Sequence, residues 1–534
     1  MKEQNLIWQY VRMWAEEYPQ KEALVFNDRR ITFENFYANT LKVAKLLLEL
    51  QVKKGDRVFV LTAARDEFMY IYMASAMVGG ILLGLNPRYT RDEIQFLIDD
   101  AKPKVGFLVR RYDYLNRDYK DDIMAVKAAN PELKHLVVIG DSWEGALSWD
   151  TELAKDRSNL DAALSKRMKE VNEDDSVYIC YTAGTTGKPK GALLTHKNLI
   201  ISSAVQNEHF VAHNHKRGEG KWLMLLPVSH IGGVINQAMS AVYWGATIVM
   251  MDHFDMAESM KLIQDEKITL TAYFPTLYLL QFMLPNFDSY DLSAVRVFAW
   301  AGAAGPEQMV RKLAQIASKT GAVLMTGYGM TELGGFGSIT ALGDSTEDLI
   351  NTVGKCYPPS KLRLVGIDGK DVPQGEVAEI WIKSPQTMKG YWNRPEATAE
   401  TLTKDGWIKT GDLASMDSRG YITMAGRTKE MFKSGGENIY PREIEAIIER
   451  DPNVALVAVL PVPDKIWGHV GKALIIPAPG KTVDLDSVKE LCKKHLANYK
   501  VPKQFEVRSY LPLTPTLKVD RIALAKELAK ELEA

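Results

Sequence analysis

Short apolar runs alternate with amphipathic segments along the first part of the chain. The runs Arg57–Thr62, Ile81–Leu85 and Val105–Val109 have the length and composition of buried strands. The segments Asp66–Val78 and Arg91–Asp100, which lie between these runs, have the length and patterning of helices. Strands that alternate with helices form parallel sheets covered by helices. The pattern therefore predicts an α/β fold.

The alternation continues to about residue 325 after one interruption. Residues 141–175 are charged and weakly periodic, and we expect them to form a surface excursion. Val177–Tyr181 then predicts a buried strand, and Thr195 begins a predicted helix. A helix from Pro306 to Ser318 precedes the predicted strand Val323–Met325. These elements extend the parallel sheets.

The pattern changes to short strands and turns after Asn351. Lys361–Val365, Ala378–Ile382 and Tyr421–Met424 are separated by glycine-containing turns and predict a small β-barrel. We therefore expect a large N-terminal domain, residues 1–426, of parallel-sheet subdomains plus this barrel.

The last hundred residues predict a smaller, separate unit. We place the division at residues 427–534 and expect a small mobile α+β lid with a hinge near Lys429. Its predicted elements are the helix Pro441–Arg450, the strands Val454–Leu460 and Lys472–Pro477, the helix Ser487–Asn498 and a closing helix.

Composition narrows the class of protein. The 534-residue chain is 46% hydrophobic and 25% charged, which is ordinary for a globular protein. A net charge of −1 gives no field that would attract nucleic acid, so no nucleic-acid partner is expected. Cys180, Cys356 and Cys492 are far apart and odd in number, so they suggest neither a disulfide framework nor a zinc site and favour a cytoplasmic location. A homodimer stays open.

Two uncharged runs are long enough to raise the question of a membrane span. Gly79-Gly80 interrupts the run Phe68–Leu85, and Pro227 and Gly245 interrupt the run Trp222–Met251. We interpret both as buried helices and strands and expect no transmembrane segment. The N-terminus carries no apolar signal-peptide core either.

A loop rich in glycine, threonine and lysine follows the predicted strand that ends at Tyr181. Its sequence is Tyr181-Thr-Ala-Gly-Thr-Thr-Gly-Lys-Pro-Lys-Gly191. Glycines let backbone N–H groups face a ligand, while hydroxyls and ammonium groups add donors and positive charge, as a polyphosphate requires. The loop is not a Walker A loop, because Thr182 stands where that motif has glycine and Pro189 follows Lys188.

The loop resembles the T-x-G-T-T-G-x-P-K-G phosphate loop of the adenylate-forming superfamily, which includes acyl-CoA synthetases, luciferases and adenylation domains. That family usually has serine at the position of Ala183, so weaker loop contacts are expected here. The resemblance implies that this loop holds the phosphates of ATP. The residues concerned are Thr182, Gly184, Thr185, Thr186, Gly187 and Lys190.

A second stretch, Gly327-Tyr-Gly-Met-Thr-Glu332, matches the Y-G-x-T-E motif of the same family. It offers an aromatic face at Tyr328, a hydroxyl for phosphate at Thr331 and a carboxylate for Mg²⁺ at Glu332, since this ion prefers oxygen ligands. By the resemblance, Gly327 and Gly329 also belong to the ATP site, and Thr185 joins Glu332 as a metal ligand.

Two stretches resemble the family's acyl-binding region. Leu223 to Gly233 is similar to L-P-x-x-H-x-x-G, whose histidine lines the entrance to the acyl pocket, so His230 is expected to be functional although a lone histidine is usually structural. Amino-acid-activating relatives have an aspartate in this segment, which is absent here. The second stretch resembles G-G-A/G-A-P and implies contacts to adenine and the acyl group from Gly302, Ala303 and Ala304.

The remaining motifs lie around the predicted domain division. Trp407-Ile-Lys-Thr-Gly-Asp412 matches W-x-x-T-G-D, in which an aspartate can accept both ribose hydroxyls. Residues 426–441 resemble the family's hinge and first lid loop. By that resemblance, Arg427 contacts ribose, Lys429 is the pivot, Lys433 is a further ligand contact, and Gly435 and Gly436 border the pantetheine channel.

Leu511 to Arg521 resembles the terminal segment L-P-x-T-x-x-G-K-x-x-R, with Leu517 in place of glycine. The resemblance makes Lys518 the catalytic lysine, although a single lysine is otherwise most often a solvated surface residue. The side chain of Leu517 restricts the backbone of this loop, which puts its geometry in doubt.

The resemblance covers nearly the whole chain and implies an AMP-forming acyl-CoA synthetase. The expected substrates are ATP with Mg²⁺, coenzyme A and a medium-chain aliphatic or aromatic carboxylic acid. A luciferase-like enzyme and a ligase for a carrier protein share these motifs and stay open as alternatives. A nucleotide-binding regulator without catalysis is disfavoured, because both Glu332 and Lys518 are present.

Overall fold

Two eight-stranded sheets form the body of the protein, which is seen here in a computed structural model that describes residues 3–182, 189–514 and 519–533. The first sheet has the order β9 (Leu147–Ser148), β8 (His135–Ile139), β5 (Val105–Val109), β3 (Arg57–Leu61), β4 (Ile81–Leu85), β10 (Ser176–Thr182), β11 (Lys190–Thr195) and β20 (Gly390–Tyr391). Its strands are parallel from β9 to β10, and β11 and β20 are antiparallel additions.

The second sheet has the order β2 (Arg29–Thr32), β1 (Glu22–Phe26), β13 (Thr247–Met250), β12 (Lys221–Met224), β14 (Leu270–Tyr273), β15 (Val297–Ala301), β16 (Val323–Met330) and β17 (Gly335–Ile339). The strands from β1 to β16 are parallel, and β2 and β17 close the edges in antiparallel pairs. Leu24 on β1 pairs with Ile248 on β13, so distant parts of the chain meet in this sheet.

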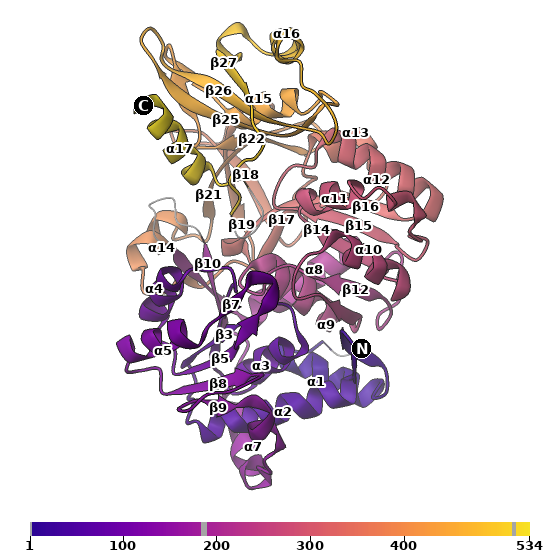
Figure 1. Cartoon of the computed structure of the whole chain (residues 1–534), viewed down its shortest axis with the longest axis vertical. Helices are drawn as coiled ribbons and strands as arrows, with labels where there is room; N and C mark the ends of the chain where they lie inside the picture. The colour runs from indigo at the N-terminus through magenta and orange to yellow at the C-terminus, as the bar shows by residue number, and fades with distance from the viewer. Residues whose placement is uncertain (1–2, 183–188, 515–518, 534) are drawn as a thin grey trace.

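The helices of the body cover the two sheets and fill the space between them (Figure 1). They are α1 (Ile7–Glu17), α2 (Phe33–Glu49), α3 (Asp66–Met77), α4 (Arg91–Ala101), α5 (Lys120–Ala129), α6 (Trp149–Ala154), α7 (Asp161–Glu170), α8 (His196–Phe210), α9 (Ser240–Trp244), α10 (Met256–Asp265), α11 (Pro275–Phe282), α12 (Glu307–Thr320) and α13 (Thr346–Asn351).

Two of these helices contact strands of both sheets. α3 packs on β3 and β4 of the first sheet and on β1 of the second, and α8 packs on β11 and on β17. Every residue of α3 is buried, which explains why its sequence has no polar face. The run Trp222–Met251 likewise forms two strands with a helical segment between them. Among the described residues, no helix is both long and apolar enough to cross a bilayer.

Two expectations from the sequence need correction. Residues 141–175 include α6 and α7 and are not merely an excursion, because the buried Arg157 pairs with the buried Glu152 and with Glu49 of α2. Charge that is paired inside the fold weakens the hydrophobic pattern on which the prediction relied. The predicted barrel is an open antiparallel sheet in the described residues, with the order β18 (Lys361–Val365), β19 (Ala378–Lys383), β21 (Ile408–Met416) and β22 (Ile422–Arg427).

The C-terminal unit lies at one end of the molecule (Figure 1) and has its own apolar cores. Its elements are the hairpin β23 (Phe432–Ser434) and β24 (Glu437–Ile439), the sheet β25 (Val454–Asp464), β26 (Gly468–Pro477) and β27 (Gln504–Val507), and the helices α15 (Pro441–Ile448), α16 (Leu485–His495) and α17 (Arg521–Glu533). The α/β class with parallel sheets and a separate C-terminal domain is confirmed.

His196 makes stability depend on pH. The backbone N–H of Ile7 donates to Nδ1 of the fully buried His196 (3.2 Å), which links α1 to α8, and burial lowers the pKa of this imidazole to about 3. In the unfolded chain the pKa is about 6.5. Below that pH the unfolded state binds a proton that the folded state does not, so acidification favours unfolding until the folded pKa is reached.

We expect the difference in unfolding free energy between wild type and His196→Gln to shift by about 2 kcal/mol between pH 7 and pH 5. The variant should lose less stability on acidification, because a glutamine side chain has no proton to gain in this range. Urea denaturation at the two pH values measures this difference. Equal losses in both proteins would show that His196 is protonated in the fold.

Candidate active site

The motif residues gather at the carboxyl ends of parallel strands from both sheets. Thr182 ends β10, and the stretch from Gly302 to Ala304 follows β15. Tyr328 lies near the end of β16, and His230 lies beyond β12. Ligands of open α/β sheets bind outside the carboxyl ends of the strands. The fold therefore brings together residues that are far apart in the sequence.

Glu332 is the first of two buried carboxylates among the motif residues. It lies in a single 3₁₀ turn, Thr331–Leu333, directly after β16. The hydroxyl of Tyr391 donates to Oε1 of Glu332 (2.6 Å). Burial raises the pKa of Glu332 above its ordinary value, and the Tyr391 hydrogen bond opposes that shift. A cation beside this carboxylate would stabilise its charged form.

Cys180 lies on β10 next to Thr331 and Glu332, and it connects the first sheet to the segment that follows β12 of the second sheet. Its thiol donates to the carbonyl of Ser229 (3.6 Å), and both Thr331 and Glu332 act on it electrostatically. Burial, together with the charge of Glu332, raises the pKa of Cys180 to about 12. The thiol therefore stays protonated at neutral pH and is not an activated nucleophile.

Asp412 is the second buried carboxylate, and it connects three motifs. The hydroxyl of Tyr328 donates to Oδ2 of Asp412 (2.6 Å), and Nε of Arg427 lies 3.0 Å from Oδ1. Asp412 is buried, whereas the Arg427 side chain is 61% exposed. Asp412 is the main cause of the raised pKa of Arg427. This carboxylate is thus held in a fixed orientation at the edge of an accessible region.

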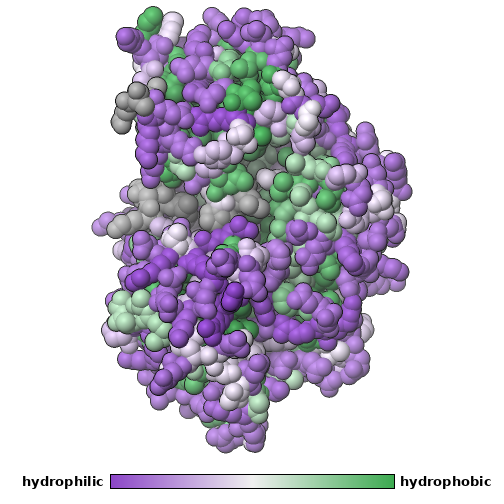
Figure 2. All heavy atoms as spheres, viewed as in Figure 1, coloured by the Kyte–Doolittle hydropathy of each residue, from purple (hydrophilic) through white to green (hydrophobic). Residues whose placement is uncertain are grey.

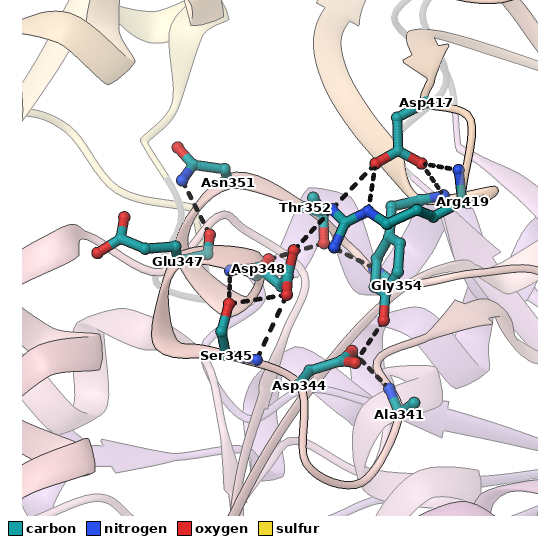
Figure 3. Close-up of polar contacts among 11 residues, drawn as sticks. Ala341, Asp344, Ser345, Glu347, Asp348, Asn351, Thr352, Gly354, Asp417 and Arg419 are labelled. Atoms are coloured by element: carbon teal, nitrogen blue, oxygen red, sulfur yellow. Dashed lines mark hydrogen bonds and ion pairs between the residues drawn. The ribbon is translucent and has the colours of Figure 1, made fainter.

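The hairpin that carries Asp412 and Arg427 is anchored at its far end (Figure 3). In the turn between β21 and β22, the guanidinium of Arg419 bonds to Asp417 (3.0 Å) and to Asp348 of α13 (2.8 Å). Tyr421 donates to Asp344, whose carboxylate also accepts from the N–H of Ala341. These contacts join the β21–β22 turn to α13 and to the segment that precedes it.

Glycines set the close approach of strands under the site. A Cβ on Gly327 would lie 2.5 Å from the carbonyl oxygen of Ser338, and a Cβ on Gly329 would lie 2.4 Å from that of Gly335. These two glycines therefore allow β16 to pair with β17. Gly327 also pairs with Ala301, which places the exposed Gly302–Ala304 stretch beside the Tyr328 motif.

The residues predicted to act on the lid lie on a turn and a hairpin after β22. Lys429 is in the turn between β22 and β23, and Lys433 is an exposed residue of β23. Gly435 and Gly436 form the β23–β24 turn with positive φ angles of 60° and 93°. A Cβ on Gly435 would lie 2.6 Å from the ring of Trp467, so this ring packs directly on the turn.

Several predicted site residues lie outside the described residues. They are Gly184, Thr185, Thr186 and Gly187 of the loop, and Lys518. Thr182 and Lys190, which flank the loop, pair across β10 and β11. Leu513 and Val519, which flank the Lys518 segment, form a bridge.

A cavity opens between the ends of the two sheets. Its wall is largely apolar and includes Ala63, Leu226 and Phe274, and Arg88 and His253 add positive and titratable groups. The ring of His230 packs edge-on against Phe274 (5.5 Å), and Nδ1 of His230 accepts from the N–H of Gly232 (3.0 Å). His230 thus borders the cavity through Phe274. Hydrophobic side chains also gather in a hollow between the C-terminal unit and the body (Figure 2).

The donor set fits a magnesium ion that is shared with phosphates. Within the described residues, no group of three or more His, Cys, Asp or Glu side chains could hold a metal alone. Mg²⁺ typically binds through one or two carboxylates and takes its other ligands from substrate phosphates and water. Glu332, directly after β16, is one such carboxylate, and the ammonium of Lys190 at the start of β11 could neutralise phosphate charge beside it.

Sequence reasoning missed Tyr391. Gly390-Tyr391 is a two-residue strand that follows no periodic pattern, and its partners Glu332 and Lys190 lie 59 and about 200 positions away. The sequence signal was a Gly-Tyr pair just before a helix start at Pro395, which by itself indicates only a turn.

The fold and the arrangement of Glu332, Asp412 and Arg427 define an adenylate-forming enzyme. The chain belongs to the AMP-binding enzyme family: residues 11–392 match the AMP-binding enzyme domain, and residues 443–518 match the AMP-binding enzyme C-terminal domain.

Relatives match the chain over nearly its whole length. An indoleacetate–CoA ligase of Aromatoleum aromaticum is 32% identical over 96% of each chain. A long-chain-fatty-acid–CoA ligase of Mycobacterium tuberculosis is 31% identical over 98% of each chain. The crystal structure of ATP-bound MatB from Rhodopseudomonas palustris superposes with a TM-score of 0.82, at 26% identity, over 98% of this chain and 99% of that one.

Proposed function

We propose that the protein is an AMP-forming acid–CoA ligase. It converts a carboxylic acid and ATP to an acyl-adenylate and pyrophosphate, and then transfers the acyl group to the thiol of coenzyme A. The observation that carries this proposal is the buried Asp412, fixed by Tyr328 and Arg427, in electrostatic reach of the buried Glu332. This pair of carboxylates supplies a ribose acceptor and a metal ligand in one site.

In the first step, the acid's carboxylate attacks the α-phosphorus of ATP, and the bond from this phosphorus to pyrophosphate breaks. Catalysis of such a displacement is mostly positioning and charge neutralisation. Asp412 accepts the ribose hydroxyls and thereby fixes the α-phosphate relative to Lys518, whose ammonium neutralises charge there. Mg²⁺ held by Glu332 would neutralise phosphate charge. The attacking group is the acid's own carboxylate, so no side-chain nucleophile is required. The protonated Cys180 takes no part in this step.

In the second step, the CoA thiolate attacks the acyl carbon and AMP leaves. The apolar cavity bordered by His230 suits a pantetheine arm or an acyl chain, and Arg88 at its wall suits a phosphate. Because Nδ1 of His230 accepts a hydrogen bond, the neutral ring carries its proton on Nε2.

The same lid has to serve both steps. We propose that residues 427–534 form a lid that rotates about Lys429 and exchanges the Lys518 segment for the Gly435-Gly436 turn. The separate apolar cores of the C-terminal unit and the turn at Lys429 support this motion.

The proposed location is the cytoplasm, where thiols stay reduced, and the three cysteines, all within the described residues, are free thiols. A homodimer is the oligomeric state that the sequence left open. Light scattering on the purified protein distinguishes it from a monomer.

The purified enzyme is expected to release pyrophosphate from ATP in the presence of an aromatic or medium-chain acid, and to consume CoA thiol in equal amount. We would screen aryl acids and aliphatic acids of increasing length, with and without CoA, and measure pyrophosphate and free thiol together. Pyrophosphate release without thiol loss would support the carrier-protein or luciferase-like alternative. No ATP–pyrophosphate exchange with any acid would contradict catalysis.

A further inference from the structure

The segment of residues 385–392, here called the crossing segment, joins the small sheet to the first large sheet. It leaves β19 and ends as β20, which pairs with β11 directly after the phosphate loop. The N–H of Lys389 donates to the carbonyl of Leu193 (2.9 Å), and the N–H of Trp392 donates to the carbonyl of Gly191 (2.7 Å). The crossing segment is therefore fixed to the strand that begins at Lys190.

The crossing segment also holds the turn that carries Glu332. The N–H of Met388 donates to the backbone carbonyl of Glu332 (2.8 Å), and the Tyr391 hydroxyl donates to its carboxylate (2.6 Å). On the other side, the ammonium of Lys190 lies 5.3 Å from the centre of the Tyr391 ring, within cation–π range. One nearly buried side chain thus contacts both the carboxylate and the lysine.

We propose that Tyr391 is a positioning residue that fixes Glu332 and Lys190 relative to each other and so couples metal binding to polyphosphate binding. The hydroxyl of Tyr391 holds one oxygen of Glu332 by a hydrogen bond and so restricts the rotation of this carboxylate. The ring limits where the Lys190 ammonium can lie. Residues that hold a metal ligand typically change metal affinity by about 10- to 100-fold when they are replaced. This inference rests on the proposed function.

The hydroxyl and the ring can be separated by two substitutions. Tyr391→Phe removes the hydroxyl and keeps the ring, and Tyr391→Leu removes both. We would titrate Mn²⁺ by electron paramagnetic resonance into enzyme that holds a non-hydrolysable ATP analogue, and measure binding of the analogue alone by calorimetry. All measurements are made at low temperature. Circular dichroism verifies that each variant is folded under these conditions.

Tyr391→Phe is expected to weaken Mn²⁺ binding about 10- to 100-fold, with binding of the metal-free analogue unchanged. Tyr391→Leu should weaken Mn²⁺ binding equally and should also weaken binding of the metal-free analogue about 2- to 5-fold, because Lys190 loses its cation–π partner. A structural role alone would lower the melting temperature and leave both affinities as in wild type.

Tyr421→Phe is the matched control, because the Tyr421 hydroxyl also donates to a carboxylate, that of Asp344, which makes no hydrogen bond or ion pair with the described residues Glu332 and Lys190. It should bind Mn²⁺ and the analogue like wild type. Wild-type Mn²⁺ affinity in Tyr391→Phe would overturn the inference, as would an equal loss in Tyr421→Phe. If wild type itself binds neither ligand, the proposed function fails instead.

Discussion

Replacing Lys518 by alanine is expected to slow formation of the acyl-adenylate by about 10²- to 10³-fold, because the ammonium that we propose neutralises charge at the α-phosphate is lost. The same variant should convert preformed acyl-AMP and CoA to thioester at the wild-type rate. ATP–pyrophosphate exchange measures the first step, and thiol consumption from synthetic acyl-AMP measures the second. If Lys518 acts in only one step of the reaction, the lid has to present different residues to the site in the two steps.

Lys526→Ala is the control for Lys518→Ala. Lys526 is an exposed residue of α17, close in sequence but outside the motif. It should leave both steps unchanged. If Lys518→Ala slowed the thioester step as strongly as adenylation, the proposal that the lid presents different residues in the two steps would be wrong.

The second large effect is expected from Asp412→Ala. It removes the proposed acceptor for both ribose hydroxyls and leaves Arg427 and the hydroxyl of Tyr328 without their carboxylate partner. Hydrogen bonds to a charged group are worth about 1.5 to 3 kcal/mol each, so losing two of them should lower kcat/KM for ATP by roughly 10²- to 10⁴-fold. Asp412→Asn keeps one acceptor oxygen and should lie between this variant and wild type.

Asp344→Asn is the matched control for Asp412, since Asp344 also accepts a tyrosine hydroxyl but lies between β17 and α13, beside the turn of the hairpin (Figure 3). Steady-state kinetics with ATP varied should show no change in this variant. An Asp412→Asn enzyme with wild-type kcat/KM for ATP would show that this carboxylate does not bind ribose.

The local pattern was sufficient for the parallel core. β3, α3, β4, α4 and β5 begin at the predicted residues, because glycine, proline and charged residues bound compact apolar runs there. The C-terminal hairpin was predicted too short, since β25 continues to Asp464 and β26 begins at Gly468. The exposed ends of long strands carry little hydrophobic signal. Only the hydrogen bonds to the neighbouring strand show where such strands begin and end.

The site was only partly accessible to sequence reasoning. Motifs gave Glu332, Tyr328 and Asp412 one by one, but the hydrogen bond that joins Tyr328 to Asp412 spans 84 positions and has no sequence signature. Tyr391 had only a turn signal in the sequence and Cys180 had none for a site, because their importance lies in contacts made by tertiary packing. The roles of the loop residues and of Lys518 stay predictions that the variants above test.

The pairing of β1 with β13 sets an order of events during protein synthesis. Leu24 leaves the ribosome more than 200 residues before its partner Ile248, which at about 5 to 20 residues per second is a wait of roughly 10 to 40 s. During that time the apolar strand Ala23–Phe26 has no parallel neighbour and is open to wrong pairing. We therefore expect expression of the folded protein to depend on chaperones that bind this strand until the middle of the chain has emerged.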